Sequence, residues 1–355
     1  MPPSPEPAPS SLRVGLVGYG LSARDFHTPV LRAAGLTVAA VATSDATRAG
    51  QVRADHPRAE VVPDLEALLG VRDLDLVVLV SPTGVHAEQA RTVIGARVPL
   101  VVDKPLAVDA TQALAVVDLA AHHGVPLTVF QNRRWDREML ALRAVRDQRL
   151  VGEITRAEYR WERWRPVPKE RWREQAAPKD GGGILLDLHS HLIDQAVLLH
   201  GEVYTVYAEI DARTTVGEDD TFLACRHVSG VVSHIAASAV SGAPGPRARV
   251  SGSQGAYVIG AQTGEATAFT GFEDELDAVG WVVRGAERTP GPQVGRADQA
   301  DFYRAVAAAL RSDDPQALMP VDPRDSVHVL AVIDAARASA AGSRVAEVIT
   351  PGQAD

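Results

Sequence analysis

A strand–turn–helix unit near the start of the chain constrains the fold most. Apolar, β-favouring residues at 14–17 run directly into Gly18-Tyr19-Gly20-Leu21-Ser22-Ala23, and a segment with helical spacing follows. In dinucleotide-binding turns the first glycine permits a tight turn, the second lets a pyrophosphate approach, and a small third residue lets helix and strand pack closely. The G-x-G-x-x-A pattern also occurs by chance in loops, so its flanking elements carry the prediction. We expect residues 18–23 to bind a dinucleotide.

Similar βα units continue as far as Gln131. Apolar runs of strand length alternate with longer segments of helical period, which is typical of a parallel sheet. The expected strands are 12–17, 36–42, 76–80, 98–102 and 127–130, and the expected helices are 24–34, 64–69, 84–95 and 109–123. We therefore predict an α/β Rossmann domain over 12–131, preceded by a Pro- and Ser-rich tail, 1–11, that we expect to be disordered.

The alternation of strand-like and helical segments stops after Gln131, which indicates a second domain over 132–355. A helix is expected at 136–147 and a strand at 155–161, and residues 203–250 form β-rich runs separated by glycine turns. This pattern predicts an α+β domain with a large, mostly antiparallel open sheet. A last helix near 325–341 is a candidate for packing back on the Rossmann domain.

Composition excludes several classes of function. A chain with 46% apolar and 23% charged residues can form ordinary cores, and no apolar run approaches the roughly 20 residues of a membrane span. The net charge of −9 argues against nonspecific nucleic-acid binding. The single cysteine, Cys225, cannot form an internal disulfide and is expected to be buried and inert. We expect a cytoplasmic protein that binds neither nucleic acid nor membrane.

A lysine follows the fourth expected strand, in Asp103-Lys104-Pro105. Ligands of open parallel sheets bind beyond the carboxyl ends of the strands. Pro105 keeps Lys104 out of the helical region, so its ammonium is held in an extended or turn geometry. We expect Asp103 and Lys104 to face the cofactor crevice; the alternative is a solvated loop lysine.

The end of the second strand bears on the choice of nicotinamide. An acid at that point would hold the ribose 2′-hydroxyl, whereas Thr43, Ser44 and Arg48 offer groups that can receive a 2′-phosphate, and Asp45 comes slightly late. The cofactor is expected to be NADP or NAD, with NADP favoured. Equally, Ser44-Asp45 can cap the next helix.

A second polar cluster lies on the helix that follows Gly181-Gly182-Gly183. Asp187, His191 and Asp194 share one face at i, i+4 and i+7, an arrangement that suits general acid–base catalysis. There are three alternatives to catalysis. The face can be exposed to solvent, form a buried hydrogen-bonded network, or bind a metal together with His189. Residues two apart on a helix point roughly 200° apart, which disfavours the metal site, so no metal is expected.

Together these elements resemble the Gfo/Idh/MocA family of NAD(P)-dependent oxidoreductases. Gly18-Tyr19-Gly20, residues 25–29 and residues 131–136 look most like the branch that contains scyllo-inositol dehydrogenases. The resemblance implies hydride transfer between a nicotinamide and a secondary alcohol or ketone of a sugar, inositol or related cyclic polyol. It also implies that the second sheet carries the substrate site and mediates a homodimer or homotetramer.

The resemblance also implies roles for individual residues. In the family, the catalytic motifs are an E-K-P lysine and a D-x-x-x-H pair, which correspond to Lys104, Asp187 and His191 here. By this resemblance, His191 accepts the hydroxyl proton, Lys104 stabilises developing alkoxide, and Asp187 contacts substrate or cofactor. Asp103 departs from the usual glutamate. His189 stands where this branch commonly has glycine, so it either enters the pocket or is a surface histidine.

Softer candidates complete the site. Ser81, Pro82 and Thr83 look like the family segment along the cofactor, and His86 matches a frequent family histidine, although helix capping would also explain them. The run 159–166 with 171–173 offers rings and guanidinium groups suited to sugars or phosphates, or a solvated edge strand. Arg163, Trp164, His189 and Asp194 are the candidate substrate contacts. A keto-sugar reductase of a biosynthetic pathway and a non-catalytic NAD(P)-binding regulator remain alternative functions.

Overall fold

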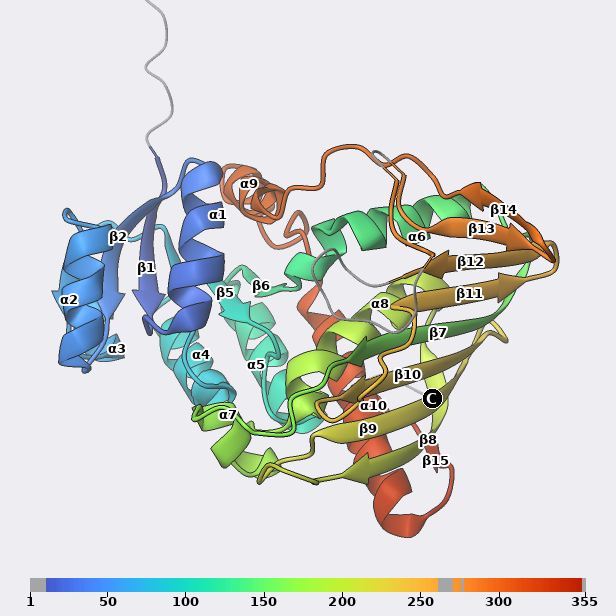
Figure 1. The fold of residues 1–355 in the computed structure, drawn as a ribbon. Coiled ribbons are helices and arrows are strands. Elements are labelled where there is room, and N and C mark those ends of the chain that lie inside the picture. The colour runs from blue at the N-terminus through green and yellow to red at the C-terminus, as the bar shows by residue number, and fades with distance from the viewer. Residues whose placement is uncertain (1–10, 261–270, 276–277, 353–355) are drawn as a thin grey trace, which may run out of the picture.

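The fold is that of a computed structural model, which describes residues 11–260, 271–275 and 278–352. Residues 1–10 of the expected tail lie outside this range, and Ser11 donates a hydrogen bond from its hydroxyl to the Gly35 carbonyl oxygen. The molecule contains two sheets, one parallel and one mostly antiparallel, side by side (Figure 1). The predicted fold class is confirmed.

The first sheet has six parallel strands in the order β3-β2-β1-β4-β5-β6. Their bounds are β1 Arg13–Val17, β2 Thr37–Ala42, β3 Glu60–Val62, β4 Leu76–Leu79, β5 Leu100–Asp103 and β6 Leu127–Phe130. The five expected strands are present within two residues at each end, whereas β3 is too short for its period to be read from sequence. Strand order reverses between β1 and β4, and that switch point is where such sheets bind ligands.

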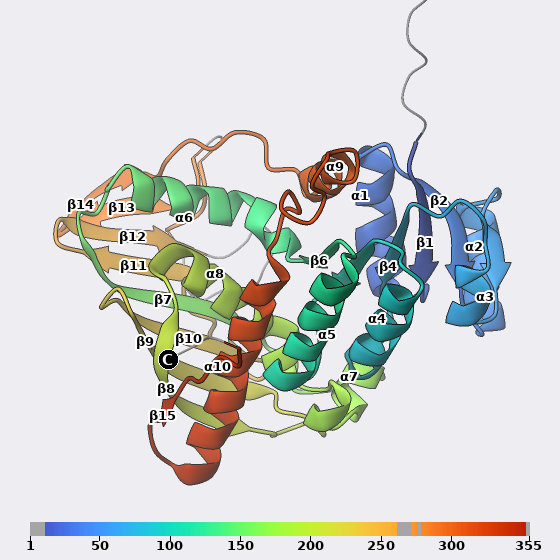
Figure 2. The ribbon, with the colours of Figure 1, turned by 180° about the vertical axis from the view of Figure 1, so that it is seen from behind.

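Helices cover both faces of this sheet. They are η1 Ser22–His27 (a π-helical turn), α1 Thr28–Ala33, α2 Ala46–Asp55, α3 Leu65–Leu69, η2 Thr83–Val85, α4 His86–Gly95 and α5 Ala110–His123. The single helix expected at 24–34 is thus a π turn continued by an α-helix. A late segment, α9 Ala300–Ala309, packs beside α1 and contributes Phe302 and Tyr303 to the same core (Figures 1 and 2).

The second sheet has nine strands in the order β14-β13-β12-β11-β7-β10-β9-β8-β15, with β7 and β10 its one parallel pair among the described residues. Their bounds are β7 Ile154–Glu162, β8 Val203–Asp211, β9 Asp220–His227, β10 Val232–Ser238, β11 Ala248–Gly252, β12 Gly255–Ile259, β13 Trp281–Arg284, β14 Glu287–Pro290 and β15 Ala346–Glu347. Side chains alternate between buried and partly exposed along β9 and β10, because one face is packed and the other is not.

Three helices cover the packed face of the second sheet: α6 Arg137–Asp147, α8 Ser190–His200 and α10 Pro323–Gly342 (Figure 2). The α10 helix also packs on α5, and the Asp334 carboxylate accepts a hydrogen bond from the Ala110 backbone N–H at 2.9 Å. It therefore ties the two sheets together. Short turns complete the fold: η3 Asn132–Trp135, α7 Trp172–Gln175, η4 Pro178–Asp180 and the π-helical η5 Leu185–His189.

The fold bears on the single cysteine and on the possibility of a membrane-spanning helix. Cys225 is fully buried in β9, and burial raises the pKa of its thiol to about 12, so it carries no reactive thiolate at neutral pH. Within the described part of the chain, no helix is both long and apolar enough to cross a membrane.

Candidate functional site

The glycine turn after β1 opens a crevice at the switch point of the parallel sheet. Gly18 has φ +94°, and a Cβ there would lie 3.0 Å from the Val80 carbonyl oxygen, so only glycine fits without strain. A Cβ at Gly20 would meet no atom within 4 Å, because that face of the turn borders the crevice. This open approach to the backbone beside the start of a helix is the shape that a pyrophosphate requires. The site therefore fits a nicotinamide dinucleotide.

Most of the predicted cofactor contacts line this crevice. Its walls include Gly18, Gly20, Leu21, Ser22, Arg48, Ser81, Pro82 and Asp103. The side chains of Tyr19 and Ala23 lie elsewhere. The Tyr19 hydroxyl donates to Asp55 at 2.9 Å from a buried ring, and Ala23 packs fully buried in the core. Only the backbone of Tyr19 is therefore available to a ligand.

Thr43, Ser44 and Arg48, at and after the end of β2, were predicted to receive a 2′-phosphate. Only one of the three lines the crevice. Arg48 lines the crevice, but Thr43 and Ser44 do not. The Thr43 hydroxyl accepts the Asp45 N–H at 3.3 Å, and the Asp45 carboxylate accepts the Arg48 N–H at 2.9 Å. Asp45 thus caps α2, as the alternative interpretation held. Arg48 is the one of these three side chains that can reach a cofactor from the crevice wall.

Thr83 and His86 are buried and do not line the crevice. The two ring nitrogens of His86 each lie 2.9 Å from a carbonyl oxygen, those of Ser81 and Pro105. Burial lowers the pKa of His86, despite both carbonyls. This histidine joins the end of β4 to the loop after β5, so it positions the crevice walls from behind. Its buried side chain is engaged by these two carbonyls and does not line the crevice where a cofactor was expected to contact it.

Asp103 ends β5 and forms part of a buried polar chain that the sequence did not reveal. Its carboxylate accepts the Ser22 hydroxyl at 2.7 Å and the Lys104 N–H at 2.8 Å, and it lies 3.6 Å from Nε2 of His27. Nδ1 of His27 in turn shares a 2.6 Å hydrogen bond with the Tyr303 hydroxyl. Burial raises the pKa of Asp103, but His27, the Lys104 ammonium and the Ser22 hydroxyl outweigh it and lower the pKa, so the carboxylate stays charged.

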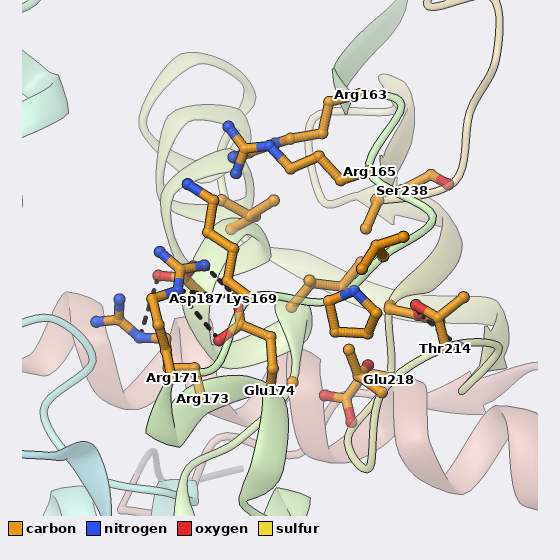
Figure 3. Close-up of a pocket in the computed structure, with 18 residues that line it drawn as sticks. Arg163, Arg165, Lys169, Arg171, Arg173, Glu174, Asp187, Thr214, Glu218 and Ser238 are labelled. Atoms are coloured by element: carbon orange, nitrogen blue, oxygen red, sulfur yellow. Dashed lines mark hydrogen bonds and ion pairs between the residues drawn. The ribbon is translucent and has the colours of Figure 1, made fainter.

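Lys104, Asp187 and His191 meet in a second pocket that adjoins the crevice. Both hollows share Leu21, Ser22 and Asp103 in their walls. Nζ of Lys104 donates to Oδ1 of Asp187 at 3.0 Å and to the Asp187 carbonyl oxygen at 2.6 Å. Nε of Arg173 lies 3.6 Å from the same carboxylate oxygen, and Figure 3 shows Arg173 reaching towards Asp187. The three predicted catalytic residues thus line one pocket.

The local structure explains this convergence. Lys104 projects from the carboxyl end of β5, at the ligand-binding edge of the parallel sheet. Asp187 lies in the π-helical turn η5, and His191 lies in the first turn of α8 that continues it. Such π turns occur frequently at functional sites, and here one presents both the carbonyl oxygen and the carboxylate of Asp187 to Lys104.

Electrostatics set the protonation states in this pocket. Burial raises the pKa of Asp187, but Lys104 and Arg173 outweigh it and hold the pKa below its usual range. Burial lowers the pKa of Lys104, against the attraction of Asp187. Burial, followed by the charges of Lys104 and Arg133, lowers the pKa of His191 well below 6.5. His191 is therefore neutral at pH 7 and able to accept a proton.

An aromatic and cationic wall surrounds His191. The Trp161 ring stacks near the imidazole with centroids 6.2 Å apart, and the guanidinium carbons of Arg133 and Arg247 lie 4.5 and 4.6 Å from the Trp161 ring. Nδ1 of His191 is buried without a hydrogen bond to any described residue, and such atoms normally have a partner. Trp161 and Arg133 line the pocket with Asn132. Trp161 belongs to the run 159–166 that was expected to suit sugars or phosphates, whereas Asn132 and Arg133 were quoted only for the family resemblance.

Three of the four predicted substrate contacts do not line this pocket. His189 is fully buried, its Nε2 hydrogen-bonds the Thr221 hydroxyl at 2.7 Å, and burial lowers its pKa to about 3, so it is neither in the pocket nor on the surface. Trp164 is 61% exposed and lines neither the cofactor crevice nor the pocket of His191. Arg163 does line the pocket. Asp194 also lies outside the pocket, in a separate ionic cluster.

Asp194 forms a buried ionic cluster with Arg134. Nε and Nη2 of Arg134 donate to its two carboxylate oxygens at 2.9 and 2.6 Å, and Nη2 also reaches Asp325 at 2.8 Å. Because Arg134 follows β6 and Asp325 lies in α10, this cluster joins three elements. Asp194 was expected to share a catalytic face with Asp187 and His191; its carboxylate is instead committed to Arg134.

We expect Asp194→Ala to lower the free energy of unfolding by about 3 kcal/mol, because it leaves Arg134 buried with only the more exposed Asp325. Urea unfolding measures this loss. Asp147→Ala is the matched control, since Asp147 pairs with Arg146 on the surface and such pairs contribute about 0–1 kcal/mol. Equal losses in the two variants would contradict a buried structural role for Asp194.

Comparison with known proteins finds relatives over most of the chain. Residues 12–131 match a sequence model described as an oxidoreductase family with an NAD-binding Rossmann fold, and residues 139–258 match the GFO/IDH/MocA C-terminal domain. The chain is 31% identical to the uncharacterized oxidoreductase YdgJ of Escherichia coli, over 91% of this chain and 95% of that one. It is 28% identical to scyllo-inositol 2-dehydrogenase (NADP(+)) IolW of Bacillus subtilis, over 94% and 95%.

Among solved structures, an NAD-binding protein from Listeria innocua superposes with a TM-score of 0.81 over 95% of this chain and 97% of that one. The two sequences are 22% identical, so this similarity supports the fold alone.

Proposed function

This chain belongs to the Gfo/Idh/MocA family of NAD(P)-dependent oxidoreductases, and we propose that it transfers hydride between the nicotinamide and a secondary alcohol or ketone of a sugar, inositol or related cyclic polyol. One observation carries the substrate chemistry: the Lys104–Asp187 ion pair and a neutral His191 line one pocket that adjoins the cofactor crevice. The names of relatives such as IolW, a scyllo-inositol dehydrogenase, support the polyol class.

The bound nicotinamide supplies the hydride acceptor or donor, and the chain supplies the proton chemistry. In the oxidative direction neutral His191 accepts the hydroxyl proton. The Lys104 ammonium donates a hydrogen bond to the same oxygen and stabilises the negative charge that develops on it. Asp187 holds the ammonium in position, and Trp161 provides a flat surface against which a ring can pack. In the reductive direction the proton moves the other way.

The direct test is fluorescence titration of the purified protein with NADPH and NADH, followed by nicotinamide absorbance with a panel of inositols, sugars and keto-sugars. The proposal expects cofactor binding and turnover of at least one cyclic polyol or its ketone. Turnover confined to keto-sugars would favour a biosynthetic reductase. Cofactor binding without turnover of any compound would favour the non-catalytic regulator, and absence of cofactor binding would refute both.

We propose that NADP is the preferred cofactor, because Arg48 lines the crevice and Asp45 is engaged in capping α2. IolW, which is similar over most of the chain, is named as an NADP(+) enzyme. Arg48→Gln is expected to weaken NADPH binding about tenfold and to change NADH binding less than about twofold, since only the 2′-phosphate loses a charged partner. Arg53→Gln, on the exposed side of the same helix, is the control. Equal effects on both nicotinamides would contradict the assignment.

The open face of the second sheet is our candidate for self-association into a homodimer or homotetramer. Phe222 and Ala224 of β9 lie opposite Ala236 and His234 of β10, and all four are only partly buried in the single chain. Light scattering of the purified protein tests this directly. A monomer at micromolar concentration would refute it.

A further inference from the structure

We infer that the substrate carries an anionic group, a carboxylate or a phosphate, which binds in a side pocket next to the reacting centre. The side pocket is the cavity between the loop 163–174, residues 183–188 and the loop 214–219 (Figure 3). It shares Arg163, Asp187 and Leu188 with the pocket that holds Lys104 and His191. This inference rests on the proposed oxidoreductase function and narrows its substrate class.

One side of the side pocket is strongly cationic. Arg163, Arg165, Lys169, Arg171 and Arg173 all line it, and in Figure 3 their side chains extend towards the side on which Asp187 lies. Arg165 and Lys169 are exposed to solvent, and on a chain of net charge −9 these five cations form a local positive patch that attracts negative ligands. Arginine and lysine in a cleft raise the local concentration of anions and bind oxyanions by charge-assisted hydrogen bonds.

The carboxylates of the pocket do not neutralise all of these cations. Arg171 pairs with Glu174, and Arg173 approaches Asp187. Asp219 is occupied by the N–H and hydroxyl of Thr214, at 2.8 and 2.5 Å. Within the described ranges, the Arg165 and Lys169 side chains form no ion pair with a carboxylate.

The cofactor does not account for these two cations. Arg171 and Arg173 also line the cofactor crevice and are therefore available to its phosphates. Arg165 and Lys169 line the side pocket but not the crevice. We therefore assign a negative group that contacts both of them to the polyol substrate, because neither residue lines the cofactor crevice.

The wall opposite the cations contains the carboxyl group of Glu218, which can accept a hydrogen bond from a substrate hydroxyl. Glu218 is 4% exposed, and its Oε1 makes no hydrogen bond to a described residue, although Arg337 lies 3.6 Å away. Gly183, with φ +86°, leaves room for this carboxyl, since a Cβ there would lie 2.4 Å from Cδ of Glu218. Burial raises the pKa of Glu218. A polyhydroxylated ring with one anionic substituent matches both walls.

The test compares a neutral sugar with its charged counterparts. Dissociation constants of glucose, glucuronate and glucose 6-phosphate are measured calorimetrically on the full chain with NADPH present, together with nicotinamide turnover of these compounds and of myo-inositol. At least one charged sugar is expected to bind about tenfold more tightly than glucose, the advantage of one charge-assisted contact. Preference for glucuronate identifies a carboxylate site, and preference for glucose 6-phosphate identifies a phosphate site.

The double variant Arg165→Gln with Lys169→Gln is expected to lose that tenfold preference while leaving the binding of glucose unchanged. The matched control is Arg72→Gln with Lys179→Gln, two exposed residues that do not line the side pocket. Binding of neither charged sugar more tightly than glucose, or full preference in the double variant, would overturn the inference. Failure of the proposed function is separate: it would appear as no nicotinamide turnover of any compound, whatever the charge preference.

Discussion

Lys104→Met is expected to lower kcat about a thousandfold while leaving the Kd of NADPH within about twofold, because positioned donors of this kind contribute roughly 10²–10³ in rate. Methionine retains much of the buried chain but loses the ammonium that donates to Asp187 at 3.0 Å. The alkoxide or ketone oxygen then loses the ammonium that donates a hydrogen bond to it. The measurement is steady-state turnover of the best compound from the polyol panel, with cofactor binding measured by fluorescence.

Lys179→Met is the matched control for this variant, since Lys179 is exposed and lines neither the crevice nor the pocket of His191. Arg173 remains near Asp187, so the variant keeps one cation beside that carboxylate and should fold. Thermal unfolding confirms folding independently of activity. A kcat within about tenfold of the wild type in a folded variant would remove Lys104 from the mechanism.

The second large effect is expected for His191→Ala, which should lower kcat roughly 10²–10⁴-fold, the range for loss of a general acid–base. The wild-type pH profile offers an independent readout. Only neutral imidazole accepts the hydroxyl proton, and burial lowers the pKa of His191 well below 6.5, so the neutral form persists to lower pH. Alcohol oxidation should therefore retain its rate from pH 8 to about pH 6.5 and decline only below that.

The acid limb of that profile should disappear in His191→Ala, because the group that titrates has been removed. His122→Ala, at an exposed position in the last turn of α5, should behave like the wild type. An acid limb that persists unchanged in His191→Ala would assign the titration to another group. An acid limb centred at or above pH 6.5 in the wild type would contradict the effect of burial on His191.

Local patterns were sufficient for much of the fold. The apolar runs that became β1, β2, β4, β5 and β6 could be read directly, because a strand buried on both faces must be apolar along its length. The three residues of β3 carry too little pattern to identify. The glycine turn was also readable, since Gly18 requires φ +94°, a conformation that L residues rarely adopt.

Helical spacing succeeded for one pair and failed for its neighbour. Asp187 and His191 line one pocket, as their spacing predicted. Asp194 has suitable spacing as well, but Arg134, 60 residues earlier, holds both of its carboxylate oxygens. Spacing along one helix shows which side chains share a face. It does not show which residue of another element binds to a side chain on that face. His189 failed similarly, because β9 lies against it and Thr221 bonds its ring.

The sequence by itself therefore determined the two-sheet architecture, the nucleotide turn and the positions of Lys104, Asp187 and His191 at ends of elements where chemistry occurs, because these depend on short-range periodicity and backbone preference. The tertiary structure alone decided which polar groups pair: Lys104 with Asp187, Asp103 with Ser22, and His27 with Tyr303. It also decided which cations line the side pocket. Most of these partners are distant in the chain, and hydrogen bonds and ion pairs require atoms within about 4 Å. Only the packing of the elements against one another sets such distances.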